Sequence, residues 1–196
     1  MASENFDTQH MAASVKILIA GGFGVGKTTM VSAISEITPL RTEELITELS
    51  AGVDDLRGVE GKTTTTVALD FGRITIDRNL VLYLFGTPGQ DRFWFLWDEL
   101  ARGALGAVVL ADTRRLDGSF AAIDFFERRN VAFTVAVNCF EGAPLYTPAE
   151  VRDALDLDER IPVLLCDARD RGSSKNVLMT LVEYLIERAA GAAAVG

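Results

Sequence analysis

A glycine-rich octet near the N-terminus carries the clearest chemical signal in the sequence. Residues 21–28 read G-G-F-G-V-G-K-T and fit the pattern G-x-x-x-x-G-K-[ST]. In this pattern, backbone N–H groups surround a phosphate at a helix N-terminus, the lysine meets the terminal phosphates and the hydroxyl ligates Mg²⁺. The strand-like run 15–20 and the helical pattern 27–37 are the flanks that this geometry needs, and they disfavour a ligand-free turn. The expected phosphate-binding residues here are Gly21, Gly24, Val25, Gly26, Lys27, Thr28 and Thr29.

A second candidate segment ends a later strand-like run. Residues 85–90 read F-G-T-P-G-Q and resemble the D-x-x-G-Q pattern of small GTPases. The resemblance implies that the Gly89 N–H contacts the terminal phosphate and that Gln90 orients the attacking water, so Gln90 and Lys27 are the expected catalytic residues. A plain Thr-Pro-Gly turn is the alternative. The family carries a magnesium-steadying aspartate where this chain has Gly86, and the expected substitutes are water, Asp54, Asp55 or Asp70.

Two more segments at strand ends resemble the guanine-reading motifs of small GTPases. Residues 138–141 read N-C-F-E where the family has N-K-x-D, and residues 167–169 read D-A-R where it has S-A-K. A carboxylate can accept two hydrogen bonds from guanine N1 and N2, and adenine offers no such pair of donors. The Ala168 N–H is expected to meet the base carbonyl. An ordinary turn is the alternative; the expected base-binding residues are Asn138, Cys139, Glu141, Ala168 and Arg169.

The magnesium shell of this pattern also needs a hydroxyl from a loop before the next strand. The run Thr63–Thr66 precedes V-A-L-D-F-G, and its register in a hairpin favours Thr66, with Thr65 second, although threonine is also a good strand former. The expected metal ligands are therefore Thr28 and Thr66, with Mg²⁺ as cofactor and GTP or GDP as ligand.

Three phrases together resemble one bacterial subgroup. T-T-T-T-V-A-L-D-F-G, L-F-G-T-P-G-Q and V-N-C-F-E-G, within residues 14–188, resemble the small Ras-like GTPases of actinobacterial conservons, relatives of the gliding-motility polarity GTPases. The resemblance implies a molecular switch with a roadblock-type protein and a sensor-kinase-like protein as partners. A phosphate-loop kinase or ATPase, and a nucleotide-bound scaffold that does not hydrolyse, remain alternatives.

Several residues bear on turnover and partner binding. The Phe23 ring stands where many relatives have glycine and is expected to crowd Gln90 or an incoming arginine, so hydrolysis is predicted to be slow. Arg57 and Arg92 are candidate arginine fingers, and Arg114-Arg115 is interpreted as a solvated turn, with a phosphate clamp as the alternative. The expected switch loops are residues 56–66 and 87–95. In the helix 92–102 one apolar stripe is core, whereas two aromatic residues outside it, Trp94 and Phe95, are expected to anchor a partner.

Strand and helix patterns alternate along the chain and must position these groups. They predict an α/β fold, the three-layer G domain of P-loop NTPases, with a six-stranded, mostly parallel sheet covered by helices on both faces. The expected G domain spans 14–188, between flexible tails 1–13 and 189–196. Strands are expected at 15–20, 64–76, 80–85, 107–111, 133–137 and 162–166. Helices are expected at 27–37, 92–102, 120–129, 175–188 and from Pro148, where residues 147–150 form a capping-box pattern, with a short one possible at 43–49. A hairpin turn is expected at 77–79.

Composition excludes several classes of function. The net charge of −9 and the pI near 4.7 argue against nucleic acid as a main ligand and against a polybasic membrane anchor. No apolar run reaches bilayer-spanning length and the start of the chain does not resemble a signal peptide, so a cytoplasmic protein without stable membrane insertion is expected. Cys139 and Cys166 are expected to be reduced packing residues.

Overall fold

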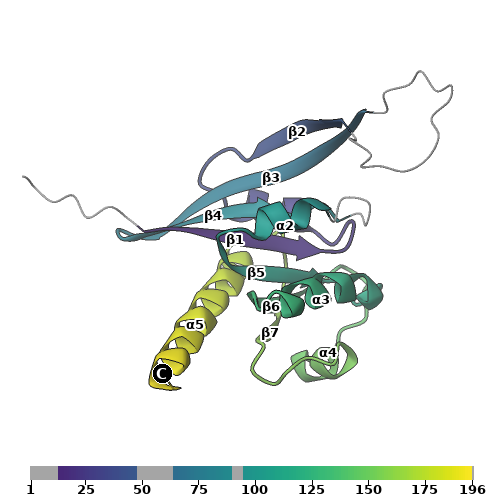
Figure 1. Ribbon diagram of the computed structural model, residues 1–196. Coiled ribbons are helices and arrows are strands. Elements are labelled where there is room, and N and C mark those ends of the chain that lie inside the picture. Colours follow the sequence, from purple (N-terminus) through teal and green to yellow (C-terminus); the bar gives the residue numbers. More distant parts are fainter. Residues whose placement is uncertain (1–12, 48–63, 90–94, 196) are drawn as a thin grey trace, which may run out of the picture.

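The fold is built on one sheet, seen in a computed structural model that describes residues 13–47, 64–89 and 95–195. In the described chain the sheet has seven strands in the order β2-β3-β4-β1-β5-β6-β7 (Figure 1). The strands are β1 (Ala13–Gly21), β2 (Leu40–Thr47), β3 (Thr64–Asp77), β4 (Leu80–Gly86), β5 (Ala104–Ala111), β6 (Ala132–Asn138) and β7 (Val163–Cys166). The helices are α1 (Lys27–Ile34), α2 (Phe95–Ala101), α3 (Phe120–Arg128), α4 (Pro148–Ala154) and α5 (Arg171–Val195), with a short 3₁₀ turn, η2 (Leu116–Ser119).

The central strands are parallel and buried. β1 pairs in parallel with β4 and β5, β5 with β6, and β6 with β7, whereas β2, β3 and β4 form an antiparallel meander. Every residue of β6 is buried, as expected of a strand covered on both faces. The predicted α/β class and the mostly parallel sheet are therefore confirmed.

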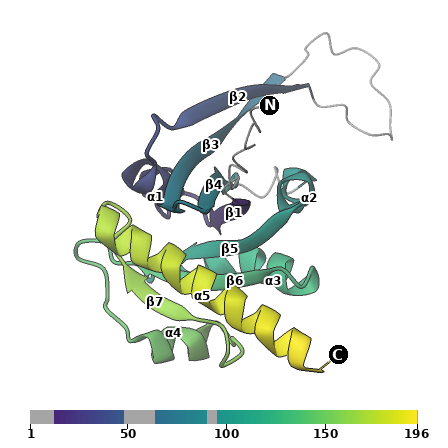
Figure 2. The same ribbon diagram turned by 90° about the vertical axis from the view of Figure 1, so that its left-hand side faces the viewer.

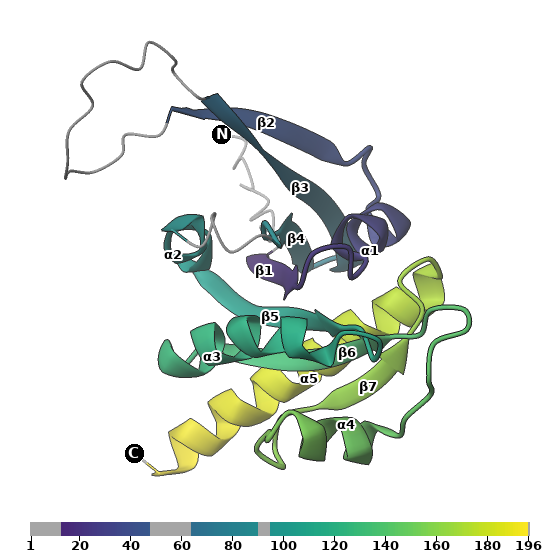
Figure 3. The same ribbon diagram turned by 90° about the vertical axis from the view of Figure 1, so that its right-hand side faces the viewer.

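Helices cover both faces of the sheet and enclose two apolar cores. α1 and α5 lie on one face, where residues such as Ile34, Leu84 and Leu178 pack together (Figure 2). α2, α3 and α4 lie on the other face, with Trp97, Phe126 and Val151 in its core (Figure 3). None of the described helices is long and apolar enough to cross a bilayer.

The strand count of the prediction is wrong by one. A short helix was considered possible at 43–49 and no strand was expected there, but residues 40–47 form β2, which pairs antiparallel with residues 64–71 of β3. Tertiary pairing thus overrides the helix propensity of the local Glu-Glu-Leu sequence. The sheet is extended at that edge to seven strands.

Helix ends also differ from the prediction. α5 continues to Val195, so residues 189–195 are helical and do not form the separate flexible tail that was expected. Alanine has the highest helix propensity and dominates this segment, so the helix extends beyond the last apolar position that packs on the sheet. α1 ends at Ile34 instead of residue 37, because Ser35 is already extended. At the N-terminus, Ala13 belongs to β1, and residues 1–12 lie outside the described chain.

Two local predictions are confirmed. α4 begins at Pro148 after a capping box in which the Glu150 carboxylate accepts from the Thr147 N–H at 2.8 Å and the Thr147 hydroxyl accepts from the Glu150 N–H at 3.3 Å. The hairpin turn between β3 and β4 is closed by the Asn79 N–H, which donates to Asp77 at 2.6 Å. Since β1, β4, β5, β6 and β7 are parallel, their carboxyl ends meet at one edge of the sheet, where ligands of such folds bind.

Candidate nucleotide-binding site

The glycine loop between β1 and α1, residues 21–28, has the backbone conformation that phosphate binding needs and is called the cradle below. Gly21, Gly24 and Gly26 have φ values of 128°, 73° and 107°, which side-chain-bearing residues rarely adopt. A Cβ on Gly21 would collide with the Leu110 carbonyl oxygen, and one on Gly26 would lie 2.7 Å from Asn138 Nδ2. Conformation therefore favours glycine at all three positions, and close neighbours also exclude a Cβ at Gly21 and Gly26.

Lys27 lies inside this loop. Its Nζ donates to the Gly21 and Gly22 carbonyl oxygens at 2.8 and 2.6 Å. Burial lowers the pKa of Lys27 to about 8, and the nearby Asp70 carboxylate opposes that shift. Gly89 packs directly against this amino group, since a Cβ on Gly89 would collide with Nζ and lie 2.9 Å from the Gly22 oxygen. Two predicted phosphate-binding segments, 21–29 and 89, are thus brought together.

The hydroxyl end of the loop meets a carboxylate from β3. The Thr28 hydroxyl donates to Asp70 Oδ2 at 2.5 Å. Asp70 lies across from Gly86 of the neighbouring β4, and a Cβ on Gly86 would be 3.2 Å from the same carboxylate oxygen. Of the substitutes considered for the missing aspartate, Asp70 therefore lies at the position concerned, while Asp54 and Asp55 are outside the described residues.

Asn138 joins the phosphate loop to the predicted base-binding loops. Its side chain is only 5% exposed; Nδ2 donates to the Val25 carbonyl oxygen at 3.0 Å, and Oδ1 accepts from the Ala168 N–H at 3.0 Å. The Cys139 N–H donates to the Cys166 carbonyl oxygen at 2.8 Å. The Ala168 N–H, predicted to meet the base, is therefore engaged by Asn138 in this structure.

The remaining predicted base-binding side chains lie near one another. Arg169 donates to both Asp167 oxygens at 2.9 Å; these hydrogen bonds, then the charge of Asp167 and to a smaller extent that of Glu141, raise the Arg169 pKa. A cavity of about 430 Å³ runs from the start of α1 to this arginine, lined by Thr28, Thr29, Ser32, Ala33 and Arg169. One cavity therefore touches both Thr28, the predicted magnesium ligand, and Arg169, one of the predicted base-binding residues.

Comparison with known proteins identifies a protein family that matches this chain. The family described as conserved hypothetical ATP-binding proteins matches residues 19–188, which cover the phosphate loop, the sheet and the predicted base-binding segments. The chain belongs to this family. As a member of it, and with a phosphate loop at the carboxyl edge of a parallel sheet, the chain is a P-loop nucleotide-binding domain by fold.

Similar sequences come from distant organisms. This member of the ATP-binding family is 32% identical to an uncharacterized protein of Methanocaldococcus jannaschii over 52% of the chain and 53% of that protein. It is 26% identical to the Ras-related protein RABC2a of Arabidopsis thaliana over 64% of the chain and 51% of that protein. The matches thus span about half the length of these curated relatives.

Similar solved structures support the fold. The cytosolic domain of the T. maritima FeoB iron transporter in apo form matches with a TM-score of 0.63 and 18% identity, over 88% of this chain and 64% of that one. The isolated G domain of the same transporter matches with a TM-score of 0.59 and 20% identity, over 90% and 99%. Other structures of that cytosolic domain are GDP and GMPPNP forms. At these identities the likeness shows the G-domain fold alone.

Some predicted site residues are not brought to the cradle. Thr66 lies in β3 opposite Leu45, four residues before Asp70, and an extended strand places it about 13 Å from that residue. It is therefore not brought beside Thr28. Gln90 lies outside the described residues, as do Arg57, Arg92 and Trp94; the side chain of Phe95 is not described either.

Two contacts near the cradle were not predicted from the sequence. The Trp97 indole is buried and donates to the Pro88 carbonyl oxygen at 3.1 Å, so α2 holds the turn that carries Gly89. Arg115 Nη2 donates to the Phe23 carbonyl oxygen at 3.0 Å, although Arg114-Arg115 was interpreted as a solvated turn. The Phe23 side chain itself is 67% exposed. The local sequence around Trp97 and Arg115 contains no pattern that predicts these contacts.

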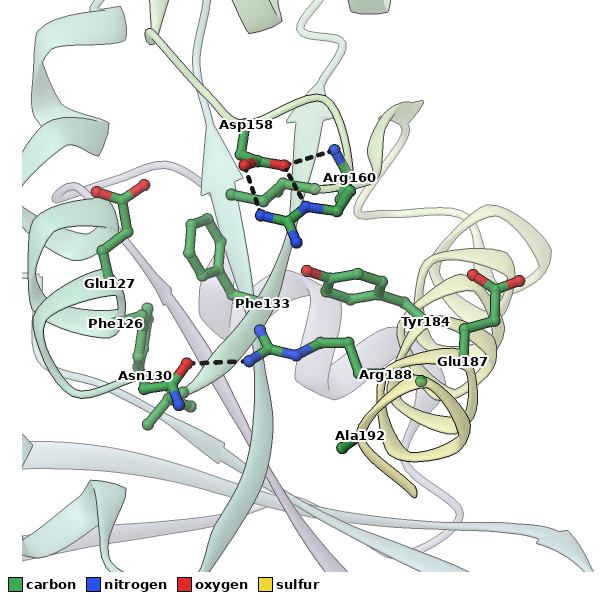
Figure 4. A pocket seen from close by; sticks show the side chains of 13 residues that line it. Phe126, Glu127, Asn130, Phe133, Asp158, Arg160, Tyr184, Glu187, Arg188 and Ala192 are labelled. Carbon is green, nitrogen blue, oxygen red and sulfur yellow. Dashed lines mark hydrogen bonds and ion pairs between the residues drawn. The ribbon is translucent and has the colours of Figure 1, made fainter. Parts of the chain in front are cut away.

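A larger cavity lies elsewhere and does not contain the predicted site. It measures about 780 Å³ and lies between α5, the end of α3 and the segment before β7 (Figure 4). Its arginines are engaged within the protein, Arg160 with Asp158 at 2.8 Å and Arg188 with Asn130 at 3.0 Å. None of the predicted phosphate- or base-binding residues lines it, so its volume does not identify the nucleotide site.

Proposed function

We propose that this protein binds GTP and GDP with Mg²⁺ and acts as a slow GTP-hydrolysing switch. The observation that carries the proposal is the double contact of Asn138, which links the Val25 carbonyl of the phosphate loop to Ala168 of the predicted base loop. A single buried amide thereby couples the groups that hold the phosphates to those that select the base.

The choice of guanine rests on the base loops. The family description names ATP, whereas a similar plant protein is Ras-related and similar structures are G domains. Glu141 lies close enough to Arg169 for its charge to contribute to the raised pKa of that guanidinium, and a carboxylate in this loop would pair with guanine N1 and N2. Adenine has an acceptor at N1, so this carboxylate favours guanine over adenine.

The residues around Thr28 fit a magnesium ion. A hydroxyl and a carboxylate within 2.5 Å of each other, beside a phosphate cradle, form the hard oxygen donor set that Mg²⁺ prefers. Thr28 would ligate the ion and Asp70 would hold it directly or through water, in the place left by Gly86. Bound Mg²⁺ would neutralise charge on the phosphate oxygens. Thr66 would join this shell only if the start of β3 moves toward Thr28.

Turnover depends on few groups of this chain. Lys27 would leave the carbonyl oxygens of its own loop and contact the terminal phosphates, Gly89 would donate its N–H, and Gln90 would orient the water. A small GTPase without an arginine finger turns over at roughly 10⁻⁴ to 10⁻³ per second. The exposed Phe23 ring next to the cradle is consistent with slow turnover, and a scaffold without turnover is the second candidate.

Signalling would pass through the segments on either side of the terminal phosphate. Residues 56–66 and 87–95 would change conformation between the GTP and GDP states and would present a surface to protein partners. The resemblance to conservon GTPases suggests a roadblock-type and a sensor-kinase-like partner in the cytoplasm. The Trp97–Pro88 hydrogen bond gives α2 a direct connection to Gly89.

The nucleotide that copurifies with the protein tests this proposal. We expect acid denaturation of freshly purified protein to release GDP or GTP, identified by chromatography against standards. The Asn138→Ala variant should retain much less nucleotide, because its phosphate and base loops are uncoupled. Release of ADP or ATP alone would contradict the guanine assignment and would favour the ATPase or kinase alternative.

A further inference from the structure

A guanidinium lies against the outside of the phosphate loop. Arg115 follows β5, and its Nη2 donates to the Phe23 carbonyl oxygen at 3.0 Å, 92 residues away in the sequence. The same nitrogen is 3.5 Å from the position that a Cβ on Gly24 would take. The contact therefore joins the middle of the glycine loop to the segment after a central strand.

The neighbouring arginine is engaged differently. Arg114 donates to the two carboxylate oxygens of buried Asp112 at 2.9 and 2.7 Å and stacks over Phe140 at 3.9 Å. Arg115 forms no ion pair with another described residue, and its guanidinium donates instead to a main-chain oxygen of the loop. Two adjacent arginines thus have separate roles, and only the second reaches the cradle.

Because a peptide unit is planar, the Arg115–Phe23 contact also fixes the orientation of the Gly24 N–H. The Phe23 carbonyl and the Gly24 N–H belong to one planar peptide, in which they point in opposite directions. A donor that holds the carbonyl therefore also holds the Gly24 N–H, which points away from Arg115. Gly24, at φ 73°, has no Cβ to restrict this peptide, so the Arg115 contact adds a restraint that the residue itself does not supply.

Ordering such a loop in advance affects phosphate binding. Successive inward N–H groups form an anion-binding concavity, and loss of loop freedom on binding lowers affinity unless the loop is already fixed. We propose that Arg115 is a positioning residue for the terminal phosphates of the nucleotide, acting through the peptide that joins Phe23 and Gly24. This inference rests on the proposed function in that it needs a nucleotide in this loop, but it does not depend on the identity of the base.

The test compares diphosphate and monophosphate binding in variants of the full-length protein. Arg115→Ala should weaken GDP binding about tenfold, equivalent to about 1.4 kcal/mol, mainly through faster release. GMP affinity should change less than twofold, because the base and α-phosphate contacts remain. Arg128→Ala, which removes an exposed arginine of α3 that pairs with Asp124, is the matched control and should leave both affinities unchanged. Unfolding curves of nucleotide-free variants should coincide.

Two further variants separate hydrogen bonding from charge. Arg115→Gln and Arg115→Lys both keep a donor and should each recover part of the lost GDP affinity. Recovery by Lys alone would overturn the proposal, since it would show that charge suffices; so would an equal loss of GDP and GMP binding, or no loss in Arg115→Ala. If wild-type protein binds ADP instead of GDP, the same comparison with ADP and AMP tests Arg115, whereas wild-type binding of neither would overturn both proposals.

Discussion

The Asp70 carboxylate lies over the α-carbon of Gly86, on the adjacent strand. A Cβ on Gly86 would come within 3.1 Å of the Asp70 Cβ, and the carboxylate reaches the Thr28 hydroxyl at 2.5 Å. A carboxylate at this place can therefore come from either of two neighbouring strands. In this chain it belongs to Asp70 of β3, whereas the small GTPase pattern has an aspartate at the position of Gly86 in β4. The cradle therefore has a neighbouring acid group, Asp70, although residue 86 is glycine.

Moving this carboxylate between the two strands tests its role. Asp70→Ala should reduce the Mg²⁺ affinity of the GDP complex at least tenfold, measured as the Mg²⁺ concentration that halves the rate of GDP release. The double variant Asp70→Gly with Gly86→Asp should recover most of this affinity, because it restores one acid group at the same place. An Asp70→Ala protein with unchanged magnesium dependence would show that Asp70 serves only the fold. Asp77→Ala, in the distant hairpin, is the control.

The lowered pKa of Lys27 predicts proton uptake on binding. In the free protein burial holds this pKa at about 8, so near pH 8 about half of the molecules carry a neutral amine. Phosphate oxygens favour the charged form and raise the pKa again, so GDP binding at pH 8 should take up about half a proton. At pH 7 the uptake should be small, because the amine is already charged.

Calorimetry in two buffers of different ionisation enthalpy measures this uptake. The second phosphate ionisation, with a pKa near 6, is about 99% complete at pH 8 and about 90% complete at pH 7, so it contributes little at pH 8. GDP affinity should also fall as the pH rises above about 8, since the free protein then loses the proton that the complex needs. Binding heats at pH 8 that are independent of the buffer would contradict the burial of Lys27 described above.

Asn138 should contribute to both binding and stability. Asn138→Ala removes the bonds to Val25 and Ala168 and leaves a buried carbonyl and N–H without those partners, at a cost of about 1–3 kcal/mol in the free energy of unfolding. Asn138→Asp keeps the acceptor for Ala168 but loses the donor to Val25. GDP affinity should decrease in both, measured by displacement of a fluorescent analogue. Equal affinity of wild type and Asn138→Ala would show that the loops are not coupled through this amide.

The two cysteines should differ sharply in reactivity. Burial raises the pKa of Cys166 to about 12, so that at pH 7 only roughly one thiol in 10⁵ is ionised. Cys139 is half-buried and lies in the predicted base segment. Mass spectrometry after iodoacetamide treatment should find Cys139 alkylated and Cys166 unmodified, with GDP slowing the reaction at Cys139. Faster reaction at Cys166 would indicate that β7 opens, and GDP-independent labelling of Cys139 would place the base elsewhere.

The sequence predicted those features that depend on short-range patterns. The glycine loop, the capping box at Thr147 and the hairpin turn at Asp77 each follow from residues a few positions apart. The neighbouring strands of the central sheet were recognisable because they are short, buried apolar runs. Gly89 and Asn138 could be placed near the phosphate loop because parallel strands bring their carboxyl ends to one edge.

Features that depend on distant pairing were not predicted, or only as one option among several. β2 is a strand because β3 lies beside it, and its own sequence also suits a helix. Asp70 was one of three candidate acids, and only the register of β3 with β4 places it over Gly86. Arg115 meets Phe23 across 92 residues and has no motif to mark it. Such contacts become visible only when the strands are paired.

Direct titration of nucleotide-free protein with GDP and with ADP, in the presence of Mg²⁺, tests the central claim most directly. The account predicts tight, saturable heat with GDP, at least 100-fold weaker binding of ADP, and loss of that preference in Glu141→Ala. Tight binding of ADP with no detectable heat from GDP would contradict it.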